Sequence, residues 1–143
     1  MLTAKVKHLF FDSALVKSRV NAGVRKVLSK FGGLVRIDDR ASMPDKAAGT
    51  QPAGHAPRKI KRTLWRSIFY SFDPQRNSVV IGAIPLPGGY ADGAAALEEG
   101  GDVTENLHGH NVPMHISPHP HTHPAFERQK EKLPNLWANS VTN

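Results

Sequence analysis

Histidine is the residue type in this chain whose possible chemistry stands out first. Six of the eight histidines fall within residues 108–123. In an extended segment His119, His121 and His123 point the same way, and two or three imidazoles can bind zinc, copper or nickel. No acidic residue or cysteine lies within the cluster, and a loop supplies no second layer of hydrogen bonds to orient ligands. A polar interaction loop is therefore the preferred interpretation. These three histidines remain a secondary metal candidate, and no cofactor is expected.

Two pairs of adjacent carboxylates are the other groups with acid–base chemistry, Asp38 with Asp39 and Glu98 with Glu99. Neighbouring side chains on a helix or strand point apart, so neither pair forms a general acid and base by itself. The sequence also lacks a phosphate-binding glycine loop with its lysine, a G-x-S-x-G nucleophile motif and an H-E-x-x-H zinc motif. No catalytic set emerges, and we expect no enzymatic activity.

Lysine and arginine are concentrated in the first half of the chain. Residues 1–76 carry 16 Lys and Arg against 5 Asp and Glu, and residues 77–143 carry 3 against 7, so the balances of +11 and −4 sum to the net charge of +7. This asymmetry indicates a basic surface that meets phosphate groups or an acidic partner; the alternative is a solvated helix face beside a basic loop. The electrostatic contact residues that we predict are Arg25, Lys26, Lys30, Arg36, Arg58, Lys59, Lys61 and Arg62.

A long amphipathic helix must position the first of these basic residues. Asp12 or Ser13 caps its start, and apolar residues recur from Val16 to Val35 at spacings of mainly three and four, which places them on one stripe. The basic residues lie on the opposite face. Gly32 and Gly33 weaken the helix, and they mark close packing or a bend near its end.

A β-hairpin is predicted next. Two runs rich in β-branched and aromatic residues, Leu64 to Phe72 and Ser78 to Ile84, flank a turn at Asp73 to Asn77. The second run is apolar almost without alternation, which suits a central strand covered on both sides or a face shared with another subunit. Because a hairpin alone is marginal in water, the long helix must cover it. The residues that we predict at a subunit interface are Val79, Val80, Ile81, Phe126 and Trp137.

Composition predicts the remaining segments. Residues 44–62 are typical of a mobile basic loop, residues 94–99 of a helical turn, and residues 102–123 of an extended His/Pro/Gly-rich loop. A short C-terminal helix starts at Pro124. The expected fold class is α+β, a single domain over residues 1–143, in which the long N-terminal helix packs on a small, mainly antiparallel sheet. No apolar run approaches the roughly 20 residues of a membrane span, so no membrane partner is expected.

Several strings in the chain, taken together, resemble one family. They are VRKVLSKFGGLVR, LWRSIFYSFDPQRNSVVIGAI, ALEEGG and HPAFERQKEKLPNLWANSV. In this order they resemble the small neck and tail-completion proteins of tailed bacteriophages, also described as minor tail or virion morphogenesis proteins. The resemblance covers about Val6 to Val141 without the histidine-rich stretch. Val103 to Pro120 is longer than usual, and residues 121–123 stand where the family commonly has an aromatic residue and a methionine.

The resemblance implies a structural role without enzymatic activity at the head-to-tail junction of a virion, in a protein made in the host cytoplasm. It implies a homo-oligomeric ring, six-fold or twelve-fold, that contacts other connector and tail proteins and lets genome DNA pass through its lumen without reading sequence. The residues themselves leave two alternatives. One is a small basic nucleic-acid-binding module, and the other is a metal-dependent protein built on the histidine cluster.

Overall fold

The structure, a computed structural model, describes residues 13–45, 51–59, 63–84, 91–107, 109–138 and 140. Its elements in chain order are α1 (Ser13–Ser42), α2 (Thr63–Ser67), β1 (Ile68–Asp73), β2 (Ser78–Ala83), α3 (Ala91–Glu99), β3 (Gly101–Leu107), β4 (His110–Ile116), α4 (Thr122–Lys130) and α5 (Leu133–Trp137). Each sheet has two antiparallel strands, β1 with β2 and β3 with β4. The predicted α+β class is confirmed.

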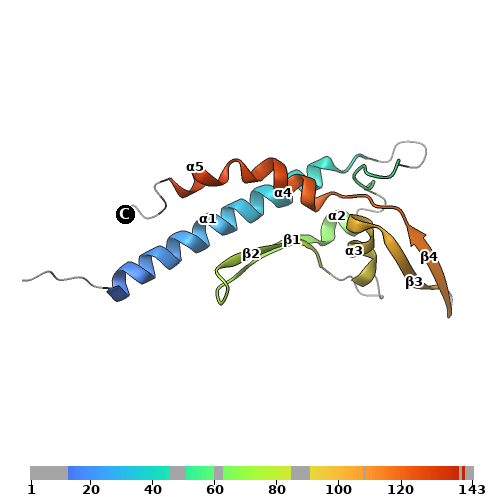
Figure 1. Cartoon of the computed structure of the whole chain (residues 1–143), viewed down its shortest axis with the longest axis horizontal. Coiled ribbons are helices and arrows are strands. Elements are labelled where there is room, and N and C mark those ends of the chain that lie inside the picture. Colours follow the sequence, from blue (N-terminus) through green and yellow to red (C-terminus); the bar gives the residue numbers. More distant parts are fainter. Residues whose placement is uncertain are drawn as a thin grey trace, which may run out of the picture.

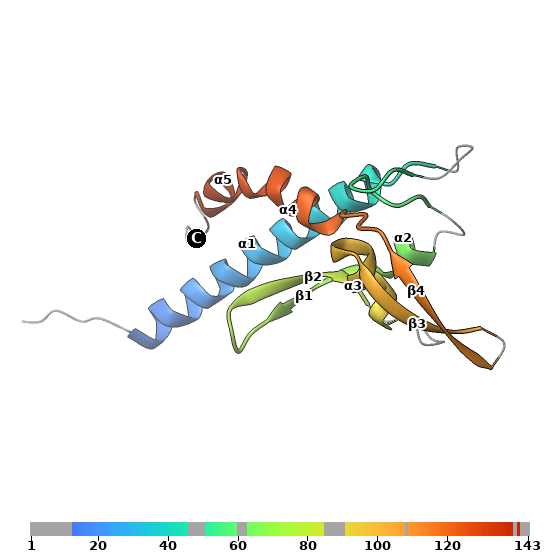
Figure 2. The ribbon, with the colours of Figure 1, turned by 45° about the vertical axis from the view of Figure 1, so that its right-hand side comes forward.

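Helix α1 is the axis of an elongated molecule (Figure 1). Its 30 residues extend over about 45 Å. Hairpin β1–β2 lies along one side of α1 and helices α4 and α5 lie along another, while hairpin β3–β4 projects from the far end (Figures 1 and 2). The N-terminal end of α1 and the tip of hairpin β3–β4 are therefore at opposite ends of the protein.

The core forms on the C-terminal half of the apolar stripe of α1. Phe31 and Val35 are buried there together with Ala125 of α4. The ring of Phe126 meets that of Phe31 edge-on, with 5.6 Å between the centroids, a geometry that aromatic pairs favour. Partly buried side chains of β2 and α5 close the cluster, namely Val79, Ile81, Leu133 and Leu136.

The N-terminal half of the same stripe is uncovered. Val16 and Val20 are 43% and 41% exposed, whereas Val27, two turns further on, is 4% exposed. The stripe that the sequence predicted is therefore real, but the described elements cover only its second half.

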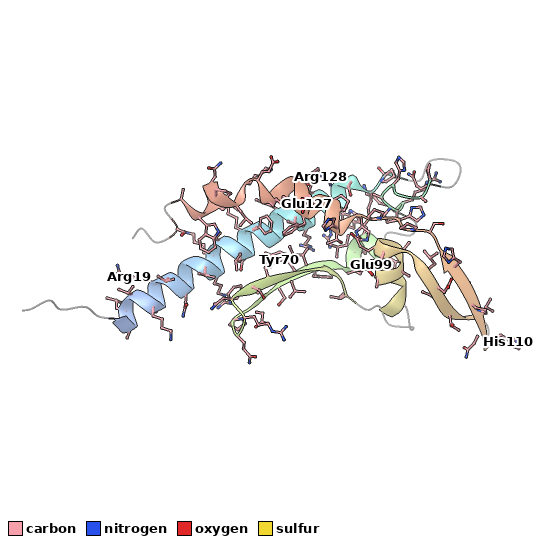
Figure 3. All side chains as sticks on the ribbon, viewed as in Figure 1. Arg19, Tyr70, Glu99, His110, Glu127 and Arg128 are labelled. Carbon is pink, nitrogen blue, oxygen red and sulfur yellow. The ribbon has the colours of Figure 1, made fainter. Side chains whose placement is uncertain are left out.

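A glycine sets how closely α1 approaches hairpin β1–β2. A Cβ atom on Gly32 would lie 2.8 Å from both Cδ2 of Tyr70 and Cγ2 of Val79, which is shorter than real Cβ contacts. A Cβ atom on Gly33 would lie 3.7 Å from the Tyr70 hydroxyl oxygen, an ordinary contact distance. The prediction that these glycines mark close packing is confirmed for Gly32, and the aromatic ring of Tyr70 fills the space (Figure 3).

Hairpin β1–β2 confirms the predicted turn. Oδ1 of Asp73 lies 2.8 Å from the backbone nitrogen of Gln75 and 3.3 Å from that of Arg76, so it accepts both N–H groups. Asn77 completes the turn with a φ of 49°, a left-handed conformation that asparagine tolerates. The turn therefore forms from local hydrogen bonds of the residues that predicted it.

Two predictions about this hairpin are wrong. Residues 64–67 were expected in the first strand, but they belong to helix α2, where the Ser67 hydroxyl donates to the carbonyl of Leu64 and the carbonyl of Arg66 accepts a hydrogen bond from Arg40. Strand β2 was considered as a central strand, but its sheet has two strands. One face of β2 packs towards the core through Val79 and Ile81, while Val80 is 65% exposed.

The prediction of an extended loop over residues 102–123 is also wrong. Strands β3 and β4 pair from Gly101 opposite Ile116 to Leu107 opposite His110, and α4 begins at Thr122. The many histidines and prolines of this segment made its strand pattern hard to recognise in the sequence. Pro113 has no N–H to donate, but a two-stranded ribbon consists only of edge strands, where proline is tolerated.

The predicted loop at residues 44–62 contains no helix or strand in its described parts, residues 44–45 and 51–59. These parts nevertheless have fixed contacts. Pro57 is buried, the N–H of Gly54 donates to the carbonyl of Pro118 over 2.8 Å, and the N–H of Lys59 donates to the carbonyl of Pro44 over 3.1 Å. Backbone hydrogen bonds thus hold the described parts of this loop against the rest of the chain, which the composition did not predict.

Replacing Gly32 by alanine is expected to lower the free energy of unfolding by about 1–3 kcal/mol, the usual cost of overpacking, against a gain of up to about 1 kcal/mol from helix propensity. Gly33→Ala is the matched control and is expected to keep or raise stability, because its Cβ has room. Urea unfolding followed by circular dichroism measures both. Equal stabilities of the two variants would contradict the close approach of Tyr70 to Gly32.

Candidate assembly and nucleic-acid interface

Residues 13–37 of α1 form a positively charged rod. Residues 13–37 contain six Lys and Arg and no Asp or Glu. Three of the four contact residues predicted on this helix are exposed, Arg25, Lys26 and Lys30, and so is Lys17. Lys26 and Lys30 are four residues apart, so they lie on the same side of the helix. This surface is able to attract phosphate groups or an acidic protein partner.

Arg36, the fourth residue predicted on this helix, is used within the chain instead. Its Nε donates to the carbonyl oxygen of Ile68 over 2.9 Å, and its guanidinium carbon lies 5.1 Å from the ring centroid of Phe69. Arg40, one turn later, donates from Nη2 to the same carbonyl over 3.0 Å and lies 4.7 Å from the ring centroid of Trp65. Burial and the positive charge of Arg36 lower the pKa of Arg40. Both arginines therefore fasten α1 to the junction of α2 and β1.

The second predicted basic cluster is only partly described. Arg58 is half-buried, and Nζ of Lys59 lies 3.5 Å from Oδ1 of Asp45, so an ion pair already engages its charge. Lys61 and Arg62 lie outside the described residues. The structure therefore brings Arg58 and Lys59 beside the segment at residues 44–45, and it places neither on the basic rod of α1.

The predicted interface residues fall into two groups. Val79, Ile81 and Phe126 gather around the core at Phe31, where they are only partly covered. Val80 points to the other face of the sheet, and Trp137 is exposed on α5. Strand alternation places Val80 on the same face as Phe69 and Ile84, which are also exposed apolar residues. In the described part of one copy, Arg36 and Arg40 contact the ring of Phe69 at one end of this face, while Val80 and Ile84 stay exposed.

The three candidate metal-binding histidines have separate surroundings. Nδ1 of His119 lies 2.9 Å from the carbonyl oxygen of His55, whereas Nδ1 of His121 lies 2.7 Å from Oδ1 of Asp39. The side chain of His123 is exposed. Among the described residues, no three His, Asp or Glu side chains are grouped as a metal site requires.

A polar junction, here called the α4 cap, holds the start of α4 and consists of Asp39, Glu98, His121 and Thr122. Oε2 of Glu98 lies 3.0 Å and 3.1 Å from the backbone nitrogens of His121 and Thr122, and Oε1 lies 2.7 Å from that of His123. One carboxylate thus accepts three N–H groups at the first turn of α4, groups that no helical carbonyl can satisfy. It replaces the local N-cap side chain, because His121 makes no side-chain cap hydrogen bond.

Asp39 ties the same turn to α1. Its Oδ2 accepts the hydroxyl of Thr122 over 2.8 Å, while its Oδ1 faces Nδ1 of His121. Asp39 and His121 are 0% and 2% exposed, and their hydrogen bonds hold α1 and the start of α4 together. On the other side of the imidazole, Nε2 lies 3.6 Å from Oε2 of Glu98. The α4 cap therefore joins α1, α3 and α4 in one buried polar contact.

The carboxylates of Glu98 in the α4 cap and of Asp38 beside it have lowered pKa values, so they stay ionised to lower pH than usual. Burial by itself raises the pKa of Glu98, but the three backbone N–H groups and the nearby His121 outweigh it, and the pKa is lowered. Burial by itself raises the pKa of Asp38 as well. The hydrogen bonds from Arg128 and Gln129 outweigh this effect, so the pKa of Asp38 is also lowered. Nε of Arg128 lies 3.0 Å from Oδ2 of Asp38, and the two side chains link α4 to α1 (Figure 3).

A groove of about 520 Å³ opens beside the α4 cap, between β2, α3 and the start of α4. Its lining is mainly aliphatic and aromatic, with carboxylates at one edge. The lining residues include Val79, Ile81, Ala95, Glu98, Glu99 and Phe126. We call it the α3 groove. Two residues predicted at a subunit interface from β2 and one from α4 meet in it.

Sequence reasoning missed the α4 cap and Arg40. It correctly expected adjacent carboxylates to point apart, since Asp38 faces Arg128 while Asp39 faces His121. It did not identify Asp39 as buried, because its partner is 82 positions away. A signal was present for Arg40, which is four residues after Arg36 on a helix that must pack on an aromatic-rich segment.

Comparison with protein-family models, curated proteins and solved structures gave no match. None of the described helices is long and apolar enough to cross a membrane. The geometry of the described residues is therefore what bears on function: a basic rod, uncovered apolar faces and a groove with an acidic edge.

The α4 cap makes stability depend on pH. Because the folded-state pKa of Glu98 lies below its ordinary value of 4.5, ionised Glu98 stabilises the fold above about pH 5, and this contribution is lost as the pH falls through the folded-state pKa. The Glu98→Gln variant is expected to be less stable by about 1–2 kcal/mol at pH 7, since a neutral amide accepts N–H groups less strongly.

Urea unfolding at a series of pH values from 7 to 3 tests this expectation. The difference between wild type and Glu98→Gln is expected to shrink towards pH 3. Glu99→Gln, which changes an exposed neighbour, serves as the control and is expected to follow the wild-type curve. A constant difference between wild type and Glu98→Gln across the series would rule out the charge-dependent cap.

Proposed function

We propose that this protein is a structural subunit of a tailed-phage virion, a neck or tail-completion protein of the head-to-tail connector. Copies assemble into a ring through which genome DNA passes. The observation that carries the proposal is the apolar surface that one copy leaves uncovered. The exposed residues that form it are Val16, Val20, Phe69, Val80, Ile84 and Trp137. These side chains lie on or beside three separate elements, α1, hairpin β1–β2 and α5, and exposed apolar faces of this kind support a role in assembly.

The two hairpins support the same proposal. Each is a separate two-stranded sheet with open edges, and such a ribbon is marginal in water unless something else covers or extends it. Helix α1 covers one face of β1–β2, whereas β3–β4 projects from the molecule, with His110 near its tip (Figure 3). Within a ring, neighbouring subunits supply the missing contacts.

The basic rod of α1 supports a contact with DNA or with an acidic neighbour in the connector. Attraction to phosphate without base reading requires only Lys and Arg, and it is independent of sequence. Lys26 and Lys30 project from a helix segment that carries no carboxylate, so their field is not neutralised locally. Attraction to phosphate that is independent of sequence suits a lumen through which the whole genome passes.

The family resemblance of the sequence supports the virion assignment, with other connector and tail proteins as partners. A second candidate is a small nucleic-acid-binding module without a virion role. The same basic rod favours it, but it gives no reason for the uncovered sheet face at Val80. We therefore place the structural role first and propose no enzymatic activity.

The first experiment is light scattering over a range of concentrations, combined with mass spectrometry of purified particles of the phage whose genome encodes the chain. The expected result is a ring-sized species in solution, or a monomer in solution that is present in particles at a copy number matching a ring. A stable monomer that is absent from particles would sink the proposal.

A second experiment measures DNA affinity at several salt concentrations. Lys26→Gln combined with Lys30→Gln is expected to reduce the slope of log affinity against log salt by about 1–2, because each phosphate contact contributes about 0.9. The matched control changes two lysines outside α1, Lys130→Gln with Lys132→Gln, and is expected to keep the slope. Tight, sequence-selective binding by a monomer would favour the nucleic-acid-binding module instead.

A further inference from the structure

The α3 groove has a composition that selects its occupant. Val79 and Ile81 of β2, Ala95 of α3 and Phe126 of α4 give it an apolar floor, and Glu99 stands exposed at its edge. Glu98, half-buried beside it, is the second carboxylate of this edge. The groove therefore fits a segment that is apolar on one side and positively charged beside it.

A small polar ligand fits the groove poorly. Binding sites for such ligands orient them with a few free polar groups. Here the carboxylate of Glu98 already accepts three backbone N–H groups, His121 is almost fully buried and the Thr122 hydroxyl donates to Asp39. Among the lining side chains, the exposed polar ones are therefore Glu99 and His123. What the groove offers is apolar contact area with an acidic edge, which is the surface that an amphipathic helix recognises.

The described chain contains one segment with the required chemistry, the first half of α1. Val16 and Val20 leave its apolar stripe exposed, and residues 13–27 add four positive charges with no negative one. This stripe continues directly into the buried core stripe, so it has the pattern of a packing surface. Arg19 on this half of α1 and Glu99 beside the groove lie far apart along the long axis of the molecule (Figure 3). One copy does not fill its own groove with its own helix.

We propose that the first half of α1 of one copy docks into the α3 groove of a second copy. This inference rests on the proposed ring and identifies its subunit contact. Val16 and Val20 enter the apolar floor, and Lys17 approaches the acidic edge at Glu99. The two surfaces differ and lie far apart along the long axis of the molecule, so the contact is heterologous. Successive head-to-tail contacts of this kind generate a closed ring when the rotation per subunit permits.

Disulfide cross-linking tests the contact directly, because the chain has no cysteine of its own. The two variants are Val20→Cys on α1 and Ala95→Cys, which lines the groove. They are mixed under conditions where light scattering shows oligomers, then oxidised and analysed without reductant. The expected result is a covalent dimer of the two variants in the mixture and little or none in either variant alone. Ile37→Cys, exposed on α1 away from this stripe, is the control partner for Ala95→Cys and is expected to give none.

Each other outcome counts against the contact. A dimer formed by Val20→Cys alone indicates a two-fold contact between α1 helices and overturns the proposal. An oligomer with no cross-link between Val20→Cys and Ala95→Cys leaves the ring intact but places its interface elsewhere. If light scattering shows a monomer at every concentration and no cross-link forms, both the contact and self-assembly in solution fail.

A second pair of variants separates docking from folding. Val20→Asp is expected to weaken self-association at least tenfold by light scattering, because it puts a charge on the apolar side of the docking helix. Ile37→Asp is the matched control and is expected to leave association unchanged. Both positions are solvent-exposed in one copy, so circular dichroism is expected to show the same fold for both variants. Equal association of the two variants overturns the proposal.

Discussion

The carboxylate of Glu98 at the start of α4 is the interaction on which the rest of the architecture depends. Helix α4 begins without a side-chain cap of its own, and its first N–H groups need an acceptor. Glu98 supplies one from α3, and Asp39 adds a second connection from α1. Because three helices share this junction, the positions of α3 and of hairpin β3–β4, which follows it, are fixed relative to α1.

A small core and long extensions follow from this arrangement. The cluster of Phe31, Val35 and Ala125 forms the centre of the core close to the α4 cap, while the first half of α1 and hairpin β3–β4 extend away from it. Polar contacts compensate for the limited apolar burial, with arginines of α1 fastening hairpin β1–β2 and Asp38 holding Arg128. Such a chain leaves apolar side chains exposed on α1, β2 and α5, and these are available to neighbours in the proposed assembly.

Local patterns predicted the elements whose structure is decided locally. The stripe from Val16 to Val35 predicted α1, and the turn residues from Asp73 to Asn77 predicted hairpin β1–β2, since both act over a few neighbouring positions. Hairpin β3–β4 escaped prediction because its strands are polar and its pairing joins residues such as Gly101 and Ile116. The α4 cap was equally hidden, because Asp39 and His121 are far apart in sequence and a single sequence carries no sign of their contact. The α3 groove likewise exists only once β2, α3 and α4 have come together.

The unequal covering of α1 has a thermodynamic consequence. Opening its first turns disrupts little apolar contact, so backbone amides there exchange with solvent through low-energy local fluctuations, while those around Phe31 exchange only when the core opens. Burial of the Val16 and Val20 side chains by any partner removes apolar surface from water and gives association a negative heat-capacity change. The same burial suppresses local opening of the first turns of the helix. The entropy cost of ordering these turns therefore offsets part of the association free energy. In the proposed contact, one helix thus connects the conformational entropy of its free end to the strength with which copies associate.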